Sequence, residues 1–176
     1  SIVLISSLDI ILAKRFFSPE LAGKYSVAST LGKIIFLGVI AISKVIVPMS
    51  SEKSNKGERT GYLLKKAMII STILSGIILF FYYFIPELII KILFGNQYID
   101  VANIVFIMGF GMFFLSLANL IILYGLSINK IKNSSFSLIG FIILEIIFFY
   151  LFHKSLIEYS ISFLIINFLI FLYSLL

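Results

Sequence analysis

The chain has 176 residues, of which 61% are hydrophobic and only 12% are charged, and its mean hydropathy is +1.16. A soluble domain is typically about 45–50% apolar and about 25% charged, so this composition excludes an ordinary soluble protein and indicates a membrane protein. The net charge of +6 does not indicate nucleic-acid binding, because most of the 14 Lys and Arg residues lie in short connectors between apolar runs, where they meet anionic lipid head groups.

The first apolar run, 1–13, carries Asp9 and is too short to cross a bilayer. As a helix it would measure about 20 Å, whereas the hydrocarbon core of a bilayer is about 30 Å thick. The run has no initiating Met and no basic segment before it, so it does not have the pattern of a secretory signal peptide. We therefore expect a partial span and a chain that is a fragment of a longer protein.

Five further apolar runs are long enough to cross a bilayer, which takes about 20 residues per helix. The predicted spans are 25–47, 66–85, 101–126, 136–152 and 156–176. Pro48 and Pro86 are expected to end the first two of these, and Tyr82 and Tyr83 suit an interfacial aromatic belt. The segment 86–100 is too short and too mixed to span and indicates a re-entrant or interfacial segment. The sequence therefore predicts an all-α, polytopic membrane bundle of about six transmembrane helices.

The basic residues favour one orientation, because cytoplasmic connectors carry an excess of Lys and Arg. The connectors on one side hold Lys53, Lys56, Arg59, Lys65, Lys66, Lys130 and Lys132, and those on the other hold Lys14, Arg15, Lys24, Lys91 and Lys154. The larger set predicts that connectors 51–61 and 128–134 are cytoplasmic. With six spans, both ends of the chain would then lie in the cytoplasm.

Four ionisable residues fall inside the predicted spans beyond the first turn, where each costs a few kcal/mol and usually faces a cavity or a partner. They are Asp9, Lys33, Lys44 and Glu145. Helical spacing also predicts a polar stripe on one face of the second span, made up of Ser26, Ser29, Thr30 and Lys33. Lys44 lies about 20° from Lys33 around the helix and about 16 Å further along it. One helix therefore presents two ammonium groups on a polar face.

These charges allow several interpretations. Lys33, near mid-depth, either lines a water-filled cavity that attracts an anion or is a packing residue. Lys44 either contacts the same substrate or extends to the membrane interface. Asp9 and Glu145 are candidate counter-ions of Lys33, in a structural ion pair that fixes helix packing. Glu145 has an alternative role in proton or cation coupling.

Groups typical of an enzyme are missing from the sequence. Asp9 and Asp100, the only Asp residues, are far apart, His153 has no partner at metal-ligand spacing, and there are no cysteines. There is no phosphate-binding P-loop, and the glycines of "GFG" (109–111) are expected to let helices approach closely. We therefore predict no catalytic residue, no metal and no cofactor, and hence a protein that is not an enzyme.

Two stretches of the sequence form a recognisable pattern. An Asp in a helix is followed by "KRFFSPELAGKYSVASTLGKI" and by a helix closing in "VIVPMSS", and a later stretch reads "PELIIKILFGNQYIDVANIVFIMGFG". The residues that carry the pattern are Asp9, Ser18, Glu20, Ala22, Gly23, Tyr25, Ser26, Ala28, Leu31, Pro48, Leu93, Phe94, Gly95, Tyr98 and Ala102. It resembles the polysaccharide-exporter families of the multidrug, oligosaccharidyl-lipid and polysaccharide flippase superfamily. The resemblance covers residues 2–132, and the last two spans match only in hydropathy.

This resemblance implies a fold and a function. Members of the superfamily have about 12–14 spans in two pseudo-symmetric six-helix lobes, so the chain would be the second lobe of a MATE-like transporter whose N-terminal lobe is missing here. The implied activity is flipping of undecaprenyl- or dolichyl-diphosphate-linked oligosaccharide, as in O-antigen synthesis, to the outer leaflet of the cytoplasmic (inner) membrane. It would proceed by alternating access without ATP, with coupling to H⁺ or Na⁺. A diphosphate crossing the membrane requires a cationic, hydrated cavity, which Lys33 and the polar stripe fit.

Other readings stay open at this point. A cation-coupled multidrug exporter of the same superfamily would more naturally use cavity carboxylates than lysines. A peptidoglycan lipid-precursor flippase would use several cavity Arg residues, which these spans lack. A non-transporting membrane scaffold would hold Asp9, Lys33 and Glu145 in closed ion pairs without access to water.

Overall fold

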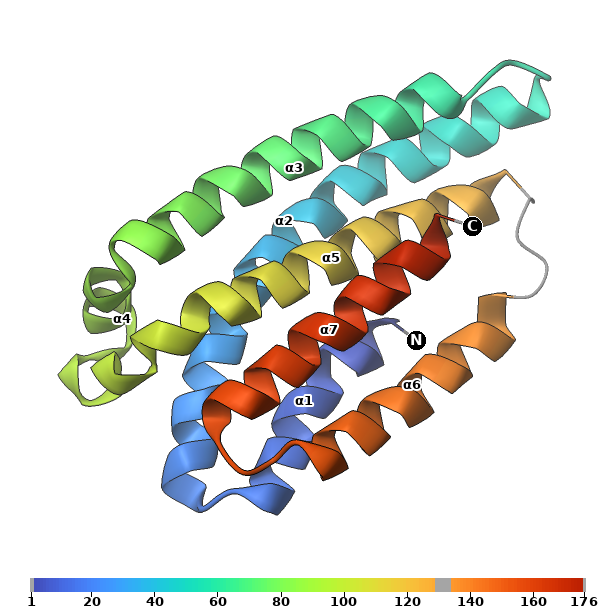
Figure 1. Cartoon of the computed structure of the whole chain (residues 1–176). Helices are drawn as coiled ribbons and strands as arrows, with labels where there is room; N and C mark the ends of the chain where they lie inside the picture. The colour runs from blue at the N-terminus through green and yellow to red at the C-terminus, as the bar shows by residue number, and fades with distance from the viewer. Residues whose placement is uncertain (1, 129–133, 176) are drawn as a thin grey trace.

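The computed structural model describes residues 2–128 and 134–175, which form a bundle of helices (Figure 1). The elements are α1 (Ile2–Phe16), α2 (Pro19–Asn55), α3 (Gly61–Phe84), α4 (Pro86–Phe94), the 3-10 helix η1 (Asn96–Val101), α5 (Ala102–Ser127), α6 (Ser134–Leu151) and α7 (Leu156–Ser174). The described residues contain no strand, and four helical segments among them are long and apolar enough to cross a membrane: α2, α3, η1 with α5, and α7. Within α6, the segment Gly140–Leu151 counts as a shorter apolar helix. The predicted all-α, polytopic membrane bundle is therefore confirmed.

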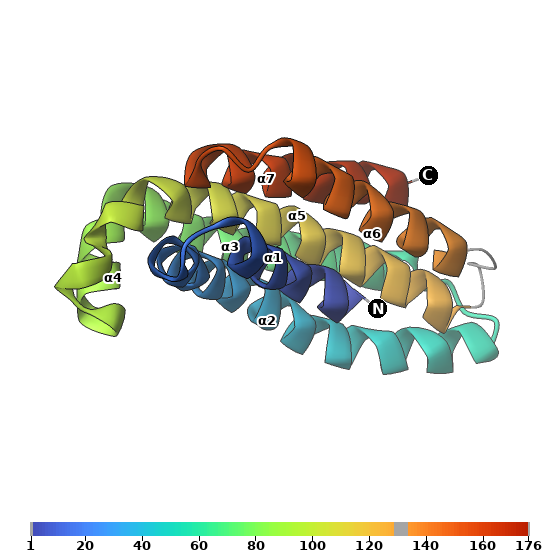
Figure 2. The same ribbon diagram turned by 90° about the horizontal axis from the view of Figure 1, so that it is seen from below.

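The connectors alternate between the two ends of the bundle, as consecutive membrane spans require. Figures 1 and 2 show the α1–α2 and α6–α7 turns at the same end as α4, and the α2–α3 connector at the opposite end. The segment 86–100, which is too short to span, forms α4 and most of η1 at the first end. Lys130 and Lys132, which contributed to the predicted orientation, lie outside the described residues.

Helix α2 continues through Pro48, where the sequence predicted its end. Pro48 lies on an exposed face and is followed by helix as far as Asn55. Proline removes one backbone N–H and crowds the carbonyl four residues earlier, here that of Lys44, but on an open face this strains no neighbouring helix. The 37 residues of α2 make a helix of about 55 Å, which is longer than the hydrocarbon core of about 30 Å. Part of α2 must therefore project beyond the membrane core.

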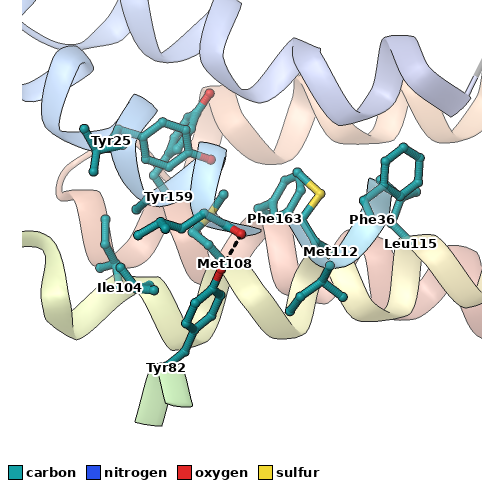
Figure 3. Close-up of a cluster of buried hydrophobic side chains, with 14 of the residues drawn as sticks. Tyr25, Phe36, Tyr82, Ile104, Met108, Met112, Leu115, Tyr159 and Phe163 are labelled. Carbon is teal, nitrogen blue, oxygen red and sulfur yellow. Dashed lines mark hydrogen bonds between the residues drawn. The ribbon is translucent and has the colours of Figure 1, made fainter. Parts of the chain in front are cut away.

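Helix α5 forms the centre of the bundle, between α2 and α3 on one side and α7 on the other (Figure 1). It is apolar around its whole circumference, which is typical of a helix buried among others. Figure 3 shows its buried side chains packed against residues of the neighbouring helices, with Ile104, Met108, Met112 and Leu115 contributed by α5.

Tyr82 is part of this interior and not of an aromatic belt. Its side chain is buried, and its OH donates a hydrogen bond of 2.7 Å to the backbone carbonyl of Leu31 (Figure 3). Tyr83, the next residue, is exposed as expected of a residue at an interface. The expectation for Tyr82 was wrong because its position around α3 turns its side chain toward Leu31 of α2 and Gly109 of α5.

The two glycines of the "GFG" segment let two helices approach α5 closely, as predicted. A Cβ at Gly109 would lie 2.9 Å from Leu79 Cδ2 of α3, and a Cβ at Gly111 would lie 2.7 Å from Phe163 Cδ1 of α7. Gly109 therefore accommodates α3, and Gly111 accommodates α7.

Substitution of Gly111 by Ala is expected to lower the free energy of unfolding by about 1–3 kcal/mol, because the added methyl overpacks the contact with Phe163. Gly76 in α3 is a matched control, since a Cβ there would meet nothing within 4 Å. Gly76→Ala is expected to be neutral or to stabilise by up to about 1 kcal/mol. Unfolding of the two variants in lipid nanodiscs measures the difference, and equal shifts for both would contradict the role of Gly111.

An ion pair between the last turn of α2 and the α2–α3 connector makes a pH-dependent contribution to stability. Lys53 Nζ lies 2.9 Å from Glu58 Oε2 and lowers the pKa of the Glu58 carboxyl below its ordinary value of 4.5. A carboxyl whose pKa is lower in the folded state stabilises the fold above its unfolded pKa, and this contribution is lost as the pH falls through the folded pKa. Glu58→Gln is therefore expected to be slightly less stable than wild type at neutral pH. The difference, followed by thermal unfolding, should shrink as the pH falls below 4.5.

Candidate functional site

Asp9 lies inside the bundle and receives two hydrogen bonds from α2. Its side chain is fully buried; Ser29 Oγ donates to Asp9 Oδ2 at 2.5 Å, and Tyr25 OH donates to the same oxygen at 3.3 Å. Tyr25 and Ser29 are four residues apart, so they are neighbours on one face of α2. The other carboxylate oxygen, Oδ1, has no hydrogen-bond partner among the described residues. The carboxylate is thus held through one oxygen only.

Tyr159 on α7 adds a third helix to this site. Its OH donates to the backbone carbonyl of Asp9 at 2.8 Å. Its ring stacks on that of Phe149 from α6, with 4.1 Å between centroids, and meets the ring of Tyr25 edge-on at 5.0 Å (Figure 3 shows Tyr25 and Tyr159 together). Each such aromatic pair contributes about 0.5–1.5 kcal/mol beyond its buried area. Helices α1, α2, α6 and α7 therefore meet around Asp9.

Glu145 is a second buried carboxylate in this interior. It precedes Phe149 by one helical turn of α6 and is fully buried. Neither of its carboxylate oxygens has a hydrogen-bond partner among the described residues, and the Asp9 carboxylate lies close enough to repel it. We call these five residues the acidic cluster: Asp9, Tyr25, Ser29, Glu145 and Tyr159.

The acidic cluster is energetically costly as it stands. A buried polar group without a partner costs about 1–3 kcal/mol, and a charged group costs more. Three of the four carboxylate oxygens of Asp9 and Glu145 lack a partner within the described parts of the chain. A packed interior could avoid this cost with apolar side chains, so the arrangement is typical of a functional site rather than of a structural core.

The cluster can bind a proton or a small hard cation. Carboxylate and hydroxyl oxygens are the ligands that hard cations prefer, and the acidic cluster supplies both. In the described ranges there is no group of three or more His, Cys, Asp or Glu that could hold a metal ion. The acidic cluster itself contributes two carboxylates and the hydroxyls of Ser29 and Tyr25.

The polar stripe predicted on α2 is divided between two environments. Ser29 faces inward to Asp9, whereas Ser26 and Thr30 each donate 2.7 Å hydrogen bonds to carbonyls of their own helix, those of Ala22 and Ser26. Thr30 is exposed, because it is turned about 100° from Ser29 around the helix. The stripe therefore has an inner edge in the acidic cluster and an outer edge on an open face of α2.

Lys33 and Lys44 belong to the outer edge. Lys33 is half-buried and Lys44 is exposed. The ammonium of Lys33 attracts the carboxylate of Asp9, but it lies beyond the 4 Å of an ion pair. Within residues 2–128 and 134–175 the ion pairs are Lys24–Glu20, Lys24–Asp100, Lys53–Glu58 and Lys56–Glu52, all outside the predicted spans. The ion pair expected of Lys33 with Asp9 or Glu145 is therefore not formed in this part of the chain.

Two members of the acidic cluster were not among the predicted site residues. Tyr25 could have been found, because it precedes Ser29 by four residues and therefore shares its face. Tyr159 could not, because it lies 150 positions from Asp9 and a single tyrosine in an apolar run carries no pattern. The remaining predicted residues are described above: Asp9, Ser29 and Glu145 come together, and Lys44 lies apart from them.

A sequence model of one protein family matches the chain. The family is described as "Polysaccharide biosynthesis protein", and the match covers residues 1–103, which is more than half of the chain. The matched part includes Asp9, Ser29 and Lys33, and Glu145 and Tyr159 lie outside it. A search of curated proteins and a search of solved structures each found no match.

Proposed function

We propose a function for this chain, which belongs to the polysaccharide biosynthesis protein family: it moves polyprenyl-diphosphate-linked oligosaccharide across the membrane that its helices span. The family match places the chain in polysaccharide biosynthesis, and its helices make it a multi-pass membrane protein. The match also agrees with the resemblance seen in the sequence. Flipping of the lipid-linked substrate by alternating access is the activity that its charges support best.

The observation that carries this proposal is the position of Lys33. Counted along α2, it lies about 14 Å from Lys24, which stands at one end of the bundle, so it falls near the middle of a core about 30 Å thick. A lysine at that depth is costly unless it faces water or an anion, and Lys33 has no carboxylate within 4 Å in the described residues. A diphosphate head group is an anion that would offset this cost while it crosses.

The acidic cluster supports a second part of the proposal, that translocation is coupled to H⁺ or Na⁺. Asp9 and Glu145 offer oxygens that lack hydrogen-bond partners in the described residues. Ser29 lies one helical turn before Lys33 and about 40° from it around the helix, so the cluster and the basic face adjoin along one stretch of α2. A cation in the cluster would weaken the pull of Asp9 on Lys33 and leave Lys33 free for an anion.

The buried carboxylates favour one alternative, a cation-coupled multidrug exporter of the same superfamily. They lie within the packed interior, however, and the basic residues occupy the open face, which suits an anionic substrate. A scaffold protein with closed ion pairs has less support, because the ion pairs of the described residues leave out Asp9, Lys33 and Glu145. We further propose that the chain is one lobe of a two-lobed transporter and not an enzyme, with the α2–α3 connector on the cytoplasmic side of the inner membrane.

Deleting the gene for the full-length protein in its native host tests the proposal. Loss of a flippase is expected to abolish surface polysaccharide and to make lipid-linked oligosaccharide accumulate on the cytoplasmic leaflet. Loss of an enzyme would instead deplete that intermediate. Unchanged polysaccharide together with increased sensitivity to cationic drugs would overturn the proposal in favour of a multidrug exporter.

A further inference from the structure

The two stretches of the family pattern meet at one end of the bundle. The first begins α2, and the second contains η1, more than seventy positions later. Lys24 joins them: its Nζ lies 3.1 Å from Asp100 Oδ2 on η1 and 3.1 Å from Glu20 Oε1 on its own helix. The Lys24 side chain is only 19% exposed, whereas the side chains of Glu20 and Asp100 are 77% and 73% exposed. The lysine is thus largely covered and its two carboxylates remain open to solvent.

A cavity of about 250 Å³ lies at this junction. It is lined by Pro19, Glu20, Gly23, Lys24, Gln97 and Tyr98. Cavities for drug-sized ligands measure about 300–1,000 Å³, so this one has the size for a single small ring. Its lining combines a carboxylate acceptor, an amide that both donates and accepts, and an amphipathic aromatic ring.

Gly23 is not explained by packing or by backbone conformation. It lies inside α2, where glycine costs about 0.5–1 kcal/mol relative to alanine. Its φ is not positive, and a Cβ placed on it would meet nothing within 4 Å. Because Gly23 lines the cavity, a long side chain at this position would occupy part of it. The absence of a side chain therefore keeps the cavity open.

The charges in and beside the cavity disfavour a diphosphate as its ligand. Glu20 and Asp100 each carry one negative charge and Lys24 one positive charge, so the three groups sum to −1. Lys24 is already engaged by two carboxylates, and an anion would be repelled by both. A neutral ligand with many hydroxyl groups would instead donate hydrogen bonds to the exposed carboxylate oxygens and receive them from Gln97.

We propose that this cavity binds a sugar residue of the lipid-linked oligosaccharide, at the end of the bundle opposite the α2–α3 connector. The proposal rests on the proposed function. The lipid-linked oligosaccharide would then be recognised at two places. Its diphosphate binds near Lys33 within the membrane, and one of its sugar residues binds in the cavity at the membrane surface. The two stretches of the family pattern, one at the start of α2 and one at η1, would together form this saccharide site.

Filling the cavity tests the proposal in cells. In a deletion strain complemented with the full-length protein, Gly23→Leu is expected to reduce surface polysaccharide at least tenfold. Gly76→Leu is the matched control, because Gly76 also lies in a helix with open space around its Cβ but does not line the cavity, and its export should stay within about twofold of wild type. Equal export by the two variants, at equal amounts in the membrane, would overturn the saccharide site alone. Unchanged polysaccharide in the deletion strain itself would overturn the proposed function.

Cysteine protection separates a sugar from an anion. The 176 residues contain no cysteine, so Gly23→Cys introduces a single thiol here, with any cysteine elsewhere in the protein replaced by serine. The host's own repeat-unit oligosaccharide, released from its lipid by mild acid, is expected to slow alkylation of this thiol by a maleimide at least threefold, and inorganic pyrophosphate is not. The same reagents should have no effect on Gly61→Cys, because Gly61 is exposed at the opposite end of the bundle with open space around its Cβ. No protection by the oligosaccharide, or equal protection by pyrophosphate, would overturn the proposal.

Discussion

Replacing Glu145 by methionine is expected to stabilise the folded protein and, at the same time, to remove the dependence of translocation on an ion gradient. Both carboxylate oxygens of Glu145 are buried without a hydrogen-bond partner in the described residues, and Asp9 repels them. Replacing a buried, unpartnered carboxyl by an apolar side chain of similar size removes its desolvation cost of about 1–3 kcal/mol. Methionine keeps the length of the side chain but cannot bind a proton or a cation.

Replacing Asp9, in the same cluster, is expected to lower the stability of the folded protein instead. Asp9→Leu would leave the hydroxyls of Ser29 and Tyr25 without their acceptor, at a cost of about 1–3 kcal/mol for each buried donor. Both variants should lose coupling, yet only Glu145→Met should become more stable. Comparing the two variants therefore separates the effect on ion coupling from the effect on stability.

The measurement pairs unfolding in lipid nanodiscs with translocation in proteoliposomes that contain the full-length protein. Translocation of a labelled polyprenyl-diphosphate oligosaccharide is followed with and without an imposed H⁺ or Na⁺ gradient. Wild type should respond to one of the two gradients, and Glu145→Met to neither. A destabilised Glu145→Met protein would show that the carboxylate has an unrecognised structural partner, and a variant that still responds to the gradient would exclude Glu145 from coupling.

Reversing the charge of Lys33 is expected to have the second large effect, on the rate of translocation. A hydrogen bond between charged groups contributes about 1.5–3 kcal/mol, which corresponds to about 10–100-fold in rate. Lys33→Glu should therefore slow translocation of the diphosphate-linked substrate by at least tenfold. Lys44→Glu is the matched control on the same face of α2, because Lys44 is exposed and about 16 Å further along the helix.

The outcome discriminates between the interpretations of this face. Slow translocation by Lys33→Glu, with Lys44→Glu close to wild type, would support an anion path at mid-depth. Equal losses in both variants would extend the path to the end of α2. Wild-type rates for Lys33→Glu would reduce Lys33 to a packing residue and leave the acidic cluster as the principal polar site.

The helices were predictable from the sequence because hydropathy and length determine which segments can span a bilayer. The limits of α2 were less predictable: proline removes a backbone N–H and crowds the carbonyl four residues earlier, which can either end a helix or only bend it, and α2 continues through Pro48. Tyr82 was misplaced for a similar reason, because residue type alone does not show which of two adjacent tyrosines faces the core.

The candidate site was predictable in its charges but not in its contacts. Asp9 and Glu145 stand out in any apolar sequence, and helical spacing identified the stripe that includes Ser29. Spacing could not show that Ser29 and Thr30 face opposite environments, since that depends on where α1 packs against α2. The contact of Tyr159 with Asp9 joins residues at opposite ends of the chain, and only the tertiary fold brings them together.

The length of α2 has a mechanical consequence. The helix begins at the proposed saccharide site, passes the acidic cluster at Ser29, and ends at Asn55 beyond the membrane core. From Ser29 to Asn55 it forms an arm of about 39 Å, so a tilt of about 10° around Ser29 would swing the far end by roughly 7 Å. A small tilt of α2 that follows ion binding in the cluster would thus produce a larger displacement at the opposite membrane surface, because the far end of the helix moves further than the part beside the bound ion.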